Sequence, residues 1–145
     1  MHVQSLGHAV LKVRNLERAE TFYNGVLGIP IAARHPSGMM TFFTLGNHHD
    51  LALLAVGDGA PAAPDNAPGL YHVAFKIGDS PEDLRRAKDD LEGAGVPIDG
   101  SADHTVSLAL YIHDPDGNGI ELYVDASDEW KRDPSRVTDI KPLVL

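Results

Sequence analysis

Two stretches of the chain resemble each other, and this internal repeat constrains the fold more than any other feature of the sequence. "GHAVLKV" at 7–13 and "YHVAFKI" at 71–77 each place a lysine four residues after a histidine, within an apolar run. Both stretches predict a buried strand that leads into a helix. Similar text follows each predicted helix, "GIPI" at 28–31 and "GVPI" at 95–98. A repeat of this kind predicts two copies of one supersecondary unit.

Each predicted helix has recognisable end signals. The first begins at Asn15 and ends at Gly28. The second is capped by Ser80, has Pro81 at its first position and ends at Gly95. The apolar faces have helical spacing and comprise Leu16, Ala19, Tyr23, Val26 and Leu27 in the first helix, and Leu84, Ala87, Leu91 and Ala94 in the second.

After each helix, the pattern changes to short strands. We expect these strands near residues 30–35, 39–45 and 48–56, and again near 97–102, 106–112 and 118–125. The sequence therefore predicts an α+β fold in which two βαβββ modules pair around a cleft. We expect one domain over residues 1–145, consisting of module one (about 5–56), a Pro-, Gly- and Ala-rich linker (57–69), module two (about 70–125) and a C-terminal tail (126–145). The tail is expected to pack against the body without a motif of its own.

Composition excludes several classes of function. The net charge of −9 argues against nucleic-acid binding, which needs an excess of Lys and Arg. The absence of cysteine removes thiolate chemistry and disulfides from consideration. No apolar run approaches the roughly 20 residues of a membrane span, and the N-terminus lacks the apolar core of a signal peptide. A cytoplasmic protein with no membrane partner is the expectation.

The histidines of the repeat are the first candidate ligands. His8 and His72 occupy equivalent positions among the eight histidines of the chain. A single histidine in an apolar strand is more often a packed core residue than a ligand. Two at one repeat position are expected to meet, because a pseudo-twofold axis would relate the modules.

The last predicted strand adds a carboxylate. In "GIELYVD" at 119–125, Ile120, Leu122 and Val124 fall on one side of the strand, whereas Glu121 falls on the other. If Glu121 faces the cleft with the two repeat histidines, it completes a two-histidine, one-carboxylate set. Such a set binds Fe(II) and leaves coordination positions open. The predicted metal ligands are His8, His72 and Glu121.

The chain resembles the vicinal oxygen chelate superfamily, which includes glyoxalases, bleomycin and fosfomycin resistance proteins and extradiol dioxygenases. The resemblance covers about residues 5–125. It is carried by "GHAVLKVRNLERAETFYNGVLGI" at 7–29, "YHVAFKI" at 71–77 and "DPDGNGIELY" at 114–123. Among its members, the chain is most similar to single-domain proteins resembling catechol 2,3-dioxygenase.

Two further stretches carry the dioxygenase resemblance. "NHHDLALLA" at 47–55 is similar to the segment that places a histidine beside the substrate, and the match falls on His49. "DHTVSLALYIHDPDGNGIELY" at 103–123 is similar to the closing segment of the family. That match implies an acid/base role for His104, a substrate hydrogen bond from Tyr111 and metal binding by Glu121. The predicted catalytic residues are His49, His104 and Tyr111.

Some positions leave alternatives open. Aligning "GNHHDLA" with "GNGIELY" places Asp50 opposite Glu121, so Asp50 is an alternative fourth ligand of a glyoxalase-like site. In a regular strand, His48 and His49 would point to opposite faces, and only one would reach the cleft. His104 and Tyr111 would also differ in parity, so His104 must lie in a loop or the strand must bulge. The remaining histidines are expected at the surface, namely His2, His35 and His113.

The resemblance implies Fe(II)-dependent extradiol cleavage of a small aromatic diol by dioxygen, with Mn(II) as a substitute for iron. Familiar extradiol dioxygenases carry two double modules, whereas this chain has one, which leaves substrate size and homo-oligomer formation open. The alternatives are a glyoxalase-like metal-dependent isomerase or lyase, and a metal-free protein that sequesters a drug.

Overall fold

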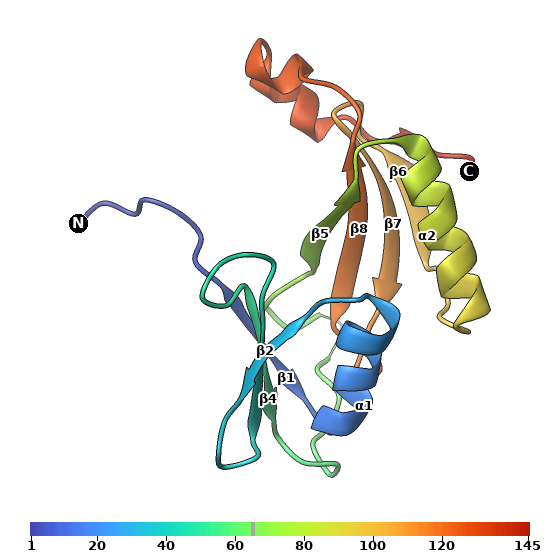
Figure 1. The fold of residues 1–145 in the computed structure, drawn as a ribbon. Coiled ribbons are helices and arrows are strands. Elements are labelled where there is room, and N and C mark those ends of the chain that lie inside the picture. Colours follow the sequence, from blue (N-terminus) through green and yellow to red (C-terminus); the bar gives the residue numbers. More distant parts are fainter. Residues whose placement is uncertain (65) are drawn as a thin grey trace. The chain divides into compact units, whose positions relative to one another are not determined.

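The computed structural model describes residues 1–64 and 66–145, and the chain divides into two compact units (Figure 1). Unit 1 comprises Met1–Pro68 and Pro115–Gly117, and unit 2 comprises Gly69–Asp114 and Asn118–Leu145. Each unit contains one mixed sheet and a module in the order βαβββ, and unit 2 adds elements from the C-terminal tail. The predicted α+β class with two repeated modules is confirmed.

Unit 1 is built on a four-stranded sheet with the strand order β1-β4-β3-β2. Strand β1 pairs with β4 in parallel, and the other pairs are antiparallel. Its elements are β1 (Ala9–Val13), α1 (Leu16–Glu20), the π-helix η1 (Thr21–Val26), β2 (Ile31–Arg34), β3 (Met40–Phe43) and β4 (Leu51–Ala55).

The helical segment of unit 1 begins where the sequence predicts, but its second part is a π-helix. The Asn15 side chain accepts a hydrogen bond from the Arg18 backbone N–H at 3.1 Å and caps α1. Further along, the Leu27 N–H donates to the Phe22 carbonyl oxygen, five residues back, at 2.9 Å. Helix α1 packs against β3 and β4.

A short stretch between β7 and β8 belongs to unit 1, because Asp116 is anchored there. The Asp116 side chain is 4% exposed and accepts hydrogen bonds from the Arg14 backbone N–H, at 3.1 Å, and from the Arg14 guanidinium, at 3.0 Å. Arg18 donates to the same carboxylate at 2.6 Å. The "DPDGNG" turn predicted from sequence therefore has a specific binding site for its second aspartate.

Unit 2 repeats the topology and adds a strand from the tail. Its sheet has the order β5-β8-β7-β6-β9, with β5 and β8 parallel. The elements are β5 (Val73–Gly78), α2 (Pro81–Gly93), β6 (Gly100–Asp103), β7 (Ser107–His113), β8 (Gly119–Asp125), the 3-10 helices η2 (Glu129–Lys131) and η3 (Pro134–Thr138), and β9 (Lys141–Pro142).

Helix α2 has the predicted N-terminal signals and covers one face of this sheet (Figure 1). Ser80 and Asp83 form a reciprocal capping box, and Pro81 occupies the first turn. Leu84 and Leu91 are buried on the face that packs against β5, β7 and β8. The helix therefore contributes apolar side chains to the core of unit 2.

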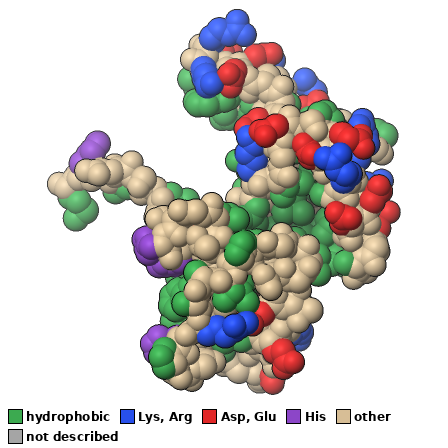
Figure 2. All heavy atoms as spheres, in the orientation of Figure 1, with side chains coloured by type: hydrophobic (Ala, Val, Ile, Leu, Met, Phe, Trp, Pro, Cys, Tyr) green, Lys and Arg blue, Asp and Glu red, His purple; other side chains and the backbone are tan. Residues whose placement is uncertain are grey.

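The C-terminal tail forms secondary structure of its own. It contains η2, η3 and the short strand β9, which pairs antiparallel with β6. On the face in Figure 2, acidic and basic side chains lie intermixed. Among the described residues, none of the helices has the length and apolar character that a membrane crossing requires.

Candidate functional site

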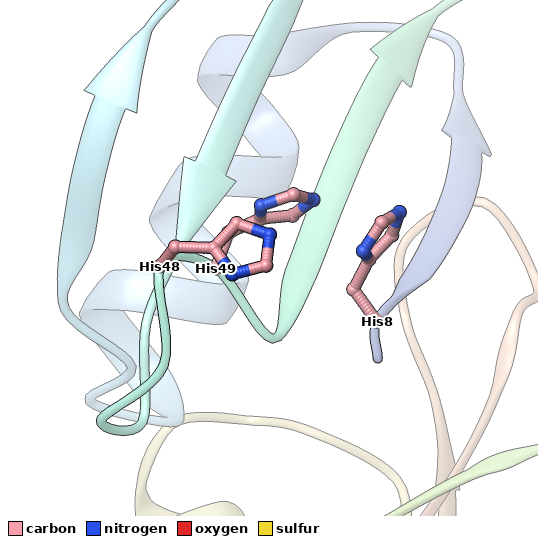
Figure 3. Close-up of side chains that lie close together, drawn as sticks. All are labelled: His8, His48 and His49. Carbon is pink, nitrogen blue, oxygen red and sulfur yellow. The ribbon is translucent and has the colours of Figure 1, made fainter. Parts of the chain in front are cut away.

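Three histidines gather at one end of the unit 1 sheet (Figure 3). His8 directly precedes β1, and His48 and His49 lie in the loop before β4. The parallel pairing brings these segments together, because the Ala9 N–H donates to the Asp50 carbonyl oxygen at 3.1 Å. The ring centroids are 4.0 Å apart for His8 and His49 and 4.5 Å apart for His48 and His49. One nitrogen from each ring lies within 4.8 Å of the others, so this cluster could hold a metal ion.

The environment of His49 favours its neutral form. Desolvation lowers the pKa of His49, and the neighbouring charges of His8 and His48 lower it further, with a smaller opposing effect from Asp50. The ring also lies nearly perpendicular to that of Phe42, at a centroid distance of 5.4 Å. A neutral imidazole is the form that binds metal and accepts a proton. His49 is therefore suited to either role.

The alternation expected for His48 and His49 in a regular strand does not apply, because the strand begins later than predicted. Strand β4 starts at Leu51, so both histidines lie in the preceding loop, where side chains need not alternate. The His48 ring consequently approaches His8, at a centroid distance of 6.2 Å, as well as His49. Sequence reasoning did not select His48; the "HH" pair was the available signal.

Asp50 has a defined structural role in the same loop. Its carboxylate oxygen Oδ2 accepts hydrogen bonds from the backbone N–H groups of Leu45, at 2.6 Å, and Asn47, at 3.3 Å. These bonds close the loop that carries the two histidines. This use of the carboxylate favours a loop-stabilising role over metal coordination.

His72 and Glu121 form a close pair in unit 2. His72 directly precedes β5, and the parallel register of β5 and β8 places Val73 beside Ile120 and Ala74 beside Glu121. The Nε2 atom of His72 lies 3.0 Å from Oε2 of Glu121. Ile120, Leu122 and Val124 are buried on the opposite side of β8, so the predicted alternation of this strand is confirmed.

A glycine allows the backbone of His72 to approach β8. A Cβ atom on Gly119 would overlap the carbonyl oxygen of Tyr71 and would lie 3.2 Å from the Cβ of His72. The absence of a side chain at this position is therefore required for the close approach. Gly119 thus helps to place His72 beside Glu121.

The His72–Glu121 pair fits a divalent metal in its chemistry and spacing. Imidazole nitrogen and carboxylate oxygen are ligands for Fe(II), and two ligands at right angles on bonds of about 2.1 Å lie about 3 Å apart. Among the residues that the structure describes, the buried Nδ1 atom of His72 has no hydrogen-bond partner. Buried polar atoms are normally partnered, so this nitrogen is an exception in the described part of the chain; it is the ring nitrogen that does not face Glu121.

Tyr111 and His104 continue the site in unit 2. Tyr111 of β7 is the direct cross-strand partner of Glu121, and its ring centroid is 5.9 Å from that of His72. Its hydroxyl lies 2.7 Å from Nε2 of His104. Burial raises the pKa of Tyr111, and the charges of Glu121 and Tyr71 raise it further. The phenol is therefore held in its protonated form, able to donate a hydrogen bond.

His104 lies in the turn between β6 and β7, as the loop alternative predicted. Thr105, the next residue, has a φ of +67°, which is unusual for a residue with a side chain. Its N–H donates to the Asp103 side chain at 2.6 Å. The turn changes the direction of the chain before β7. His104 can therefore reach Tyr111, although the two residues would point to opposite faces in one regular strand.

The predicted site residues thus fall into two groups. His72, Glu121, Tyr111 and His104 come together in unit 2. His8 and His49 come together in unit 1, so their meeting with the first group stays a prediction. The remaining predicted surface histidines are exposed, namely His2, His35 and His113.

The family model of the Glyoxalase/Bleomycin resistance protein/Dioxygenase superfamily matches residues 5–122, and the chain belongs to this superfamily. It is 38% identical over 130 residues to the catechol-2,3-dioxygenase of Bacillus subtilis (strain 168), a match that covers 88% of this chain and 44% of that protein. It is also 32% identical over 123 residues to the glutathione transferase FosA of Serratia marcescens, covering 84% of this chain and 82% of that protein.

A solved structure shows the same fold. The crystal structure of a glyoxalase/dioxygenase from Nostoc punctiforme aligns with a TM-score of 0.72 at 24% identity, covering 86% of this chain and 92% of that one. The chain spans less than half the length of the Bacillus relative. The family of the chain is therefore established. Its members include relatives with different reactions, so the family alone does not identify the reaction of this chain.

Proposed function

We propose that the chain is an Fe(II)-dependent extradiol dioxygenase that cleaves the ring of a catechol-like aromatic diol with dioxygen. The observation that carries this proposal is the 3.0 Å pair of His72 and Glu121 with the Tyr111 hydroxyl and His104 beside it. His72, Glu121 and His8 would hold the metal, and Mn(II) would be accepted by the same ligands. When bound, Fe(II) would supply coordination positions for the two substrate oxygens and for dioxygen.

The residues of the chain would handle the protons. A catechol must lose protons from its hydroxyl groups when it binds a metal. Tyr111 would hydrogen-bond a substrate oxygen, and its contact with Nε2 of His104 would allow a proton to pass to that ring. His49 would act where dioxygen reacts with the substrate. Its neutral imidazole can accept a proton there before donating it.

The relatives support this proposal in part. The Bacillus protein is a catechol-2,3-dioxygenase, and the 38% identity extends over most of this chain. Because the chain spans only 44% of that relative, the size of the accepted diol is itself a proposal.

The glyoxalase-like alternative makes a different demand on the site. An isomerase or lyase of that type would recruit a fourth protein ligand, and Asp50 is the carboxylate at the matching repeat position. The Asp50 carboxylate instead accepts two backbone hydrogen bonds within its own loop. This observation favours the three-ligand dioxygenase.

Oxygen uptake by anaerobically prepared Fe(II) protein tests the proposal. Addition of catechol in air-saturated buffer should cause oxygen consumption and formation of a yellow ring-opened product. Resorcinol, whose hydroxyl groups are not adjacent and cannot both bind one metal, is the matched control substrate. Absence of oxygen uptake across a panel of substituted catechols, with iron bound, would contradict the assignment.

A further inference from the structure

The C-terminal tail reaches the turn that carries His104. Strand β9 pairs with β6 through Ala102 opposite Pro142 and Asp103 opposite Lys141. The Ser101 hydroxyl donates to the Leu143 carbonyl oxygen at 2.9 Å. The tail is therefore tied to both the strand and the turn that precede β7.

One contact of the tail falls on the His104 ring itself. The Nδ1 atom of His104 lies 2.9 Å from the backbone carbonyl oxygen of Asp139. A carbonyl oxygen only accepts hydrogen bonds, so Nδ1 must carry the hydrogen. In the neutral ring, Nε2 is then unprotonated and accepts the hydrogen bond from the Tyr111 hydroxyl, 2.7 Å away.

We propose that the C-terminal tail is a positioning element that holds His104 in the Nδ1–H tautomer, so that Nε2 is the proton acceptor facing Tyr111. Among the residues that the structure describes, the Asp139 carbonyl oxygen is the hydrogen-bond partner of Nδ1, so its removal would leave this side of the ring without a contact that selects the tautomer. In the Nε2–H tautomer the ring would donate to Tyr111, and the direction of the hydrogen bond would reverse.

The Nδ1–H tautomer sets the direction of proton transfer, which runs from the substrate through Tyr111 to His104. This assignment of roles rests on the proposed function. With its hydrogen donated to His104, the Tyr111 oxygen has lone pairs available for a substrate hydroxyl. As the substrate O–H bond breaks, an O–H bond forms on Tyr111, the original Tyr111 O–H bond breaks, and an N–H bond forms at Nε2. The resulting imidazolium keeps its Nδ1–H bond to the Asp139 carbonyl oxygen.

The segment that carries the carbonyl is itself braced. Asp139 follows η3, and its N–H donates to the Arg136 carbonyl oxygen at 3.2 Å. The Arg136 guanidinium contacts the Asp139 carboxylate at 3.1 Å and the Glu129 carboxylate of η2, also at 3.1 Å. These contacts fix Asp139 and the end of η3 relative to η2.

Two truncated chains separate the effect of residues 139–142, which include Asp139 and β9, from that of residues 143–145. A chain of residues 1–138 lacks Asp139 and β9, whereas a chain of residues 1–142 keeps both. None of residues 139–145 is buried, so both chains are expected to fold. Backbone amide spectra check this expectation.

Long-range proton–nitrogen NMR of ¹⁵N-labelled protein, without paramagnetic metal, reads the tautomer of each histidine ring. The His104 signal is assigned from its loss in His104→Gln, and spectra are taken at a pH where titration shows a neutral ring. We expect Nδ1–H in the full chain and in 1–142, and a mixture or Nε2–H in 1–138. An Nε2–H ring in the full chain, or an unchanged Nδ1–H ring in folded 1–138, would overturn the proposal; the full-chain result decides even if 1–138 does not fold.

Activity provides a separate readout. We expect 1–138 to lose about 10-fold in kcat, less than the 10²–10⁴-fold typical of a whole acid/base group. In a His104→Gln background, the truncation should cost nothing more, because both changes act through one ring. Absence of oxygen uptake by the intact chain would contradict the proposed dioxygenase function but would not affect the tautomer result. An active chain with His104 in the Nε2–H tautomer would contradict only the role proposed for the tail.

Discussion

The Nε2 atom of His72 lies 3.0 Å from Oε2 of Glu121, although 48 residues of chain separate them between β5 and β8. The parallel register of these strands and the bare backbone of Gly119 create this proximity. Unit 1 holds a second set of candidate ligands in His8, His48 and His49. His8 is a candidate ligand both with His72 and Glu121 and with His48 and His49. Mutagenesis can show which of the two ligand sets binds the metal.

Metal content distinguishes the two ligand sets. We expect Glu121→Ala and His72→Ala to lose most of their iron while keeping the fold, because each removes one of three ligands. His48→Phe should retain iron. Iron analysis with circular dichroism on each variant checks this, and stoichiometric iron in Glu121→Ala together with loss from His48→Phe would transfer the site to the histidine cluster.

His49 is expected to act in turnover. His49→Phe should keep iron and bind catechol but react 10²–10⁴-fold more slowly, the usual worth of a positioned acid/base group. His48→Phe is the matched control, and its effect should be milder, because the Nδ1 atom of His48 lies 3.1 Å from its own loop at Asn47 Oδ1. Equal losses of kcat in the two variants would remove the distinction between them.

Asp50→Asn tests the fourth-ligand alternative. The amide oxygen can still accept from the N–H groups of Leu45 and Asn47, so the loop should be preserved. We expect unchanged iron content and oxygen uptake. Loss of metal from a folded Asp50→Asn protein would instead support the isomerase or lyase branch.

Gly119→Ala should damage both stability and metal binding. The new Cβ would overlap the Tyr71 carbonyl oxygen, and relieving that overlap must move His72 or β8. We expect a loss of about 1–3 kcal/mol in the free energy of unfolding, measured in urea, with reduced iron affinity. Gly100→Ala is the control, because among the described residues, its own chain neighbours aside, no heavy atom lies within 4 Å of a Cβ there; equal behaviour of the two variants would contradict the close-approach argument.

Glu20 should make stability depend on pH in the acid range. Its hydrogen bonds to Arg34, and a further one to Thr41, lower its pKa below the ordinary value near 4.5, against the opposing effect of burial. Because the folded state favours the carboxylate, this stabilisation is present above pH 4.5 and is lost as the pH falls through the lowered pKa. Urea titrations between pH 3 and 6 should show a shallower decline for Glu20→Gln than for the original chain; identical slopes would argue against the linkage.

Much of the fold was predictable because it depends on local pattern. The two repeated first strands, the Ser80 cap of α2 and the alternation around Glu121 all appear as predicted, although His8 and His72 directly precede their strands. These features depend on side-chain period and capping, which are properties of neighbouring residues. The sequence by itself therefore determined the two βαβββ modules and the side of β8 on which Glu121 lies.

Other features were decided only by the tertiary structure. Strand β4 begins at Leu51 because its pairing with β1 starts at Ala9, and this places His48 in a loop that can turn toward His8. The tail acquires η3 and β9 through contacts with β6 and the His104 turn, far away in sequence. Strand pairing and backbone hydrogen bonds between distant segments depend on where the chain folds back. The local spacing of apolar and polar residues does not indicate that position. For this reason, the tautomer of His104 depends on a carbonyl oxygen 35 residues further along the chain.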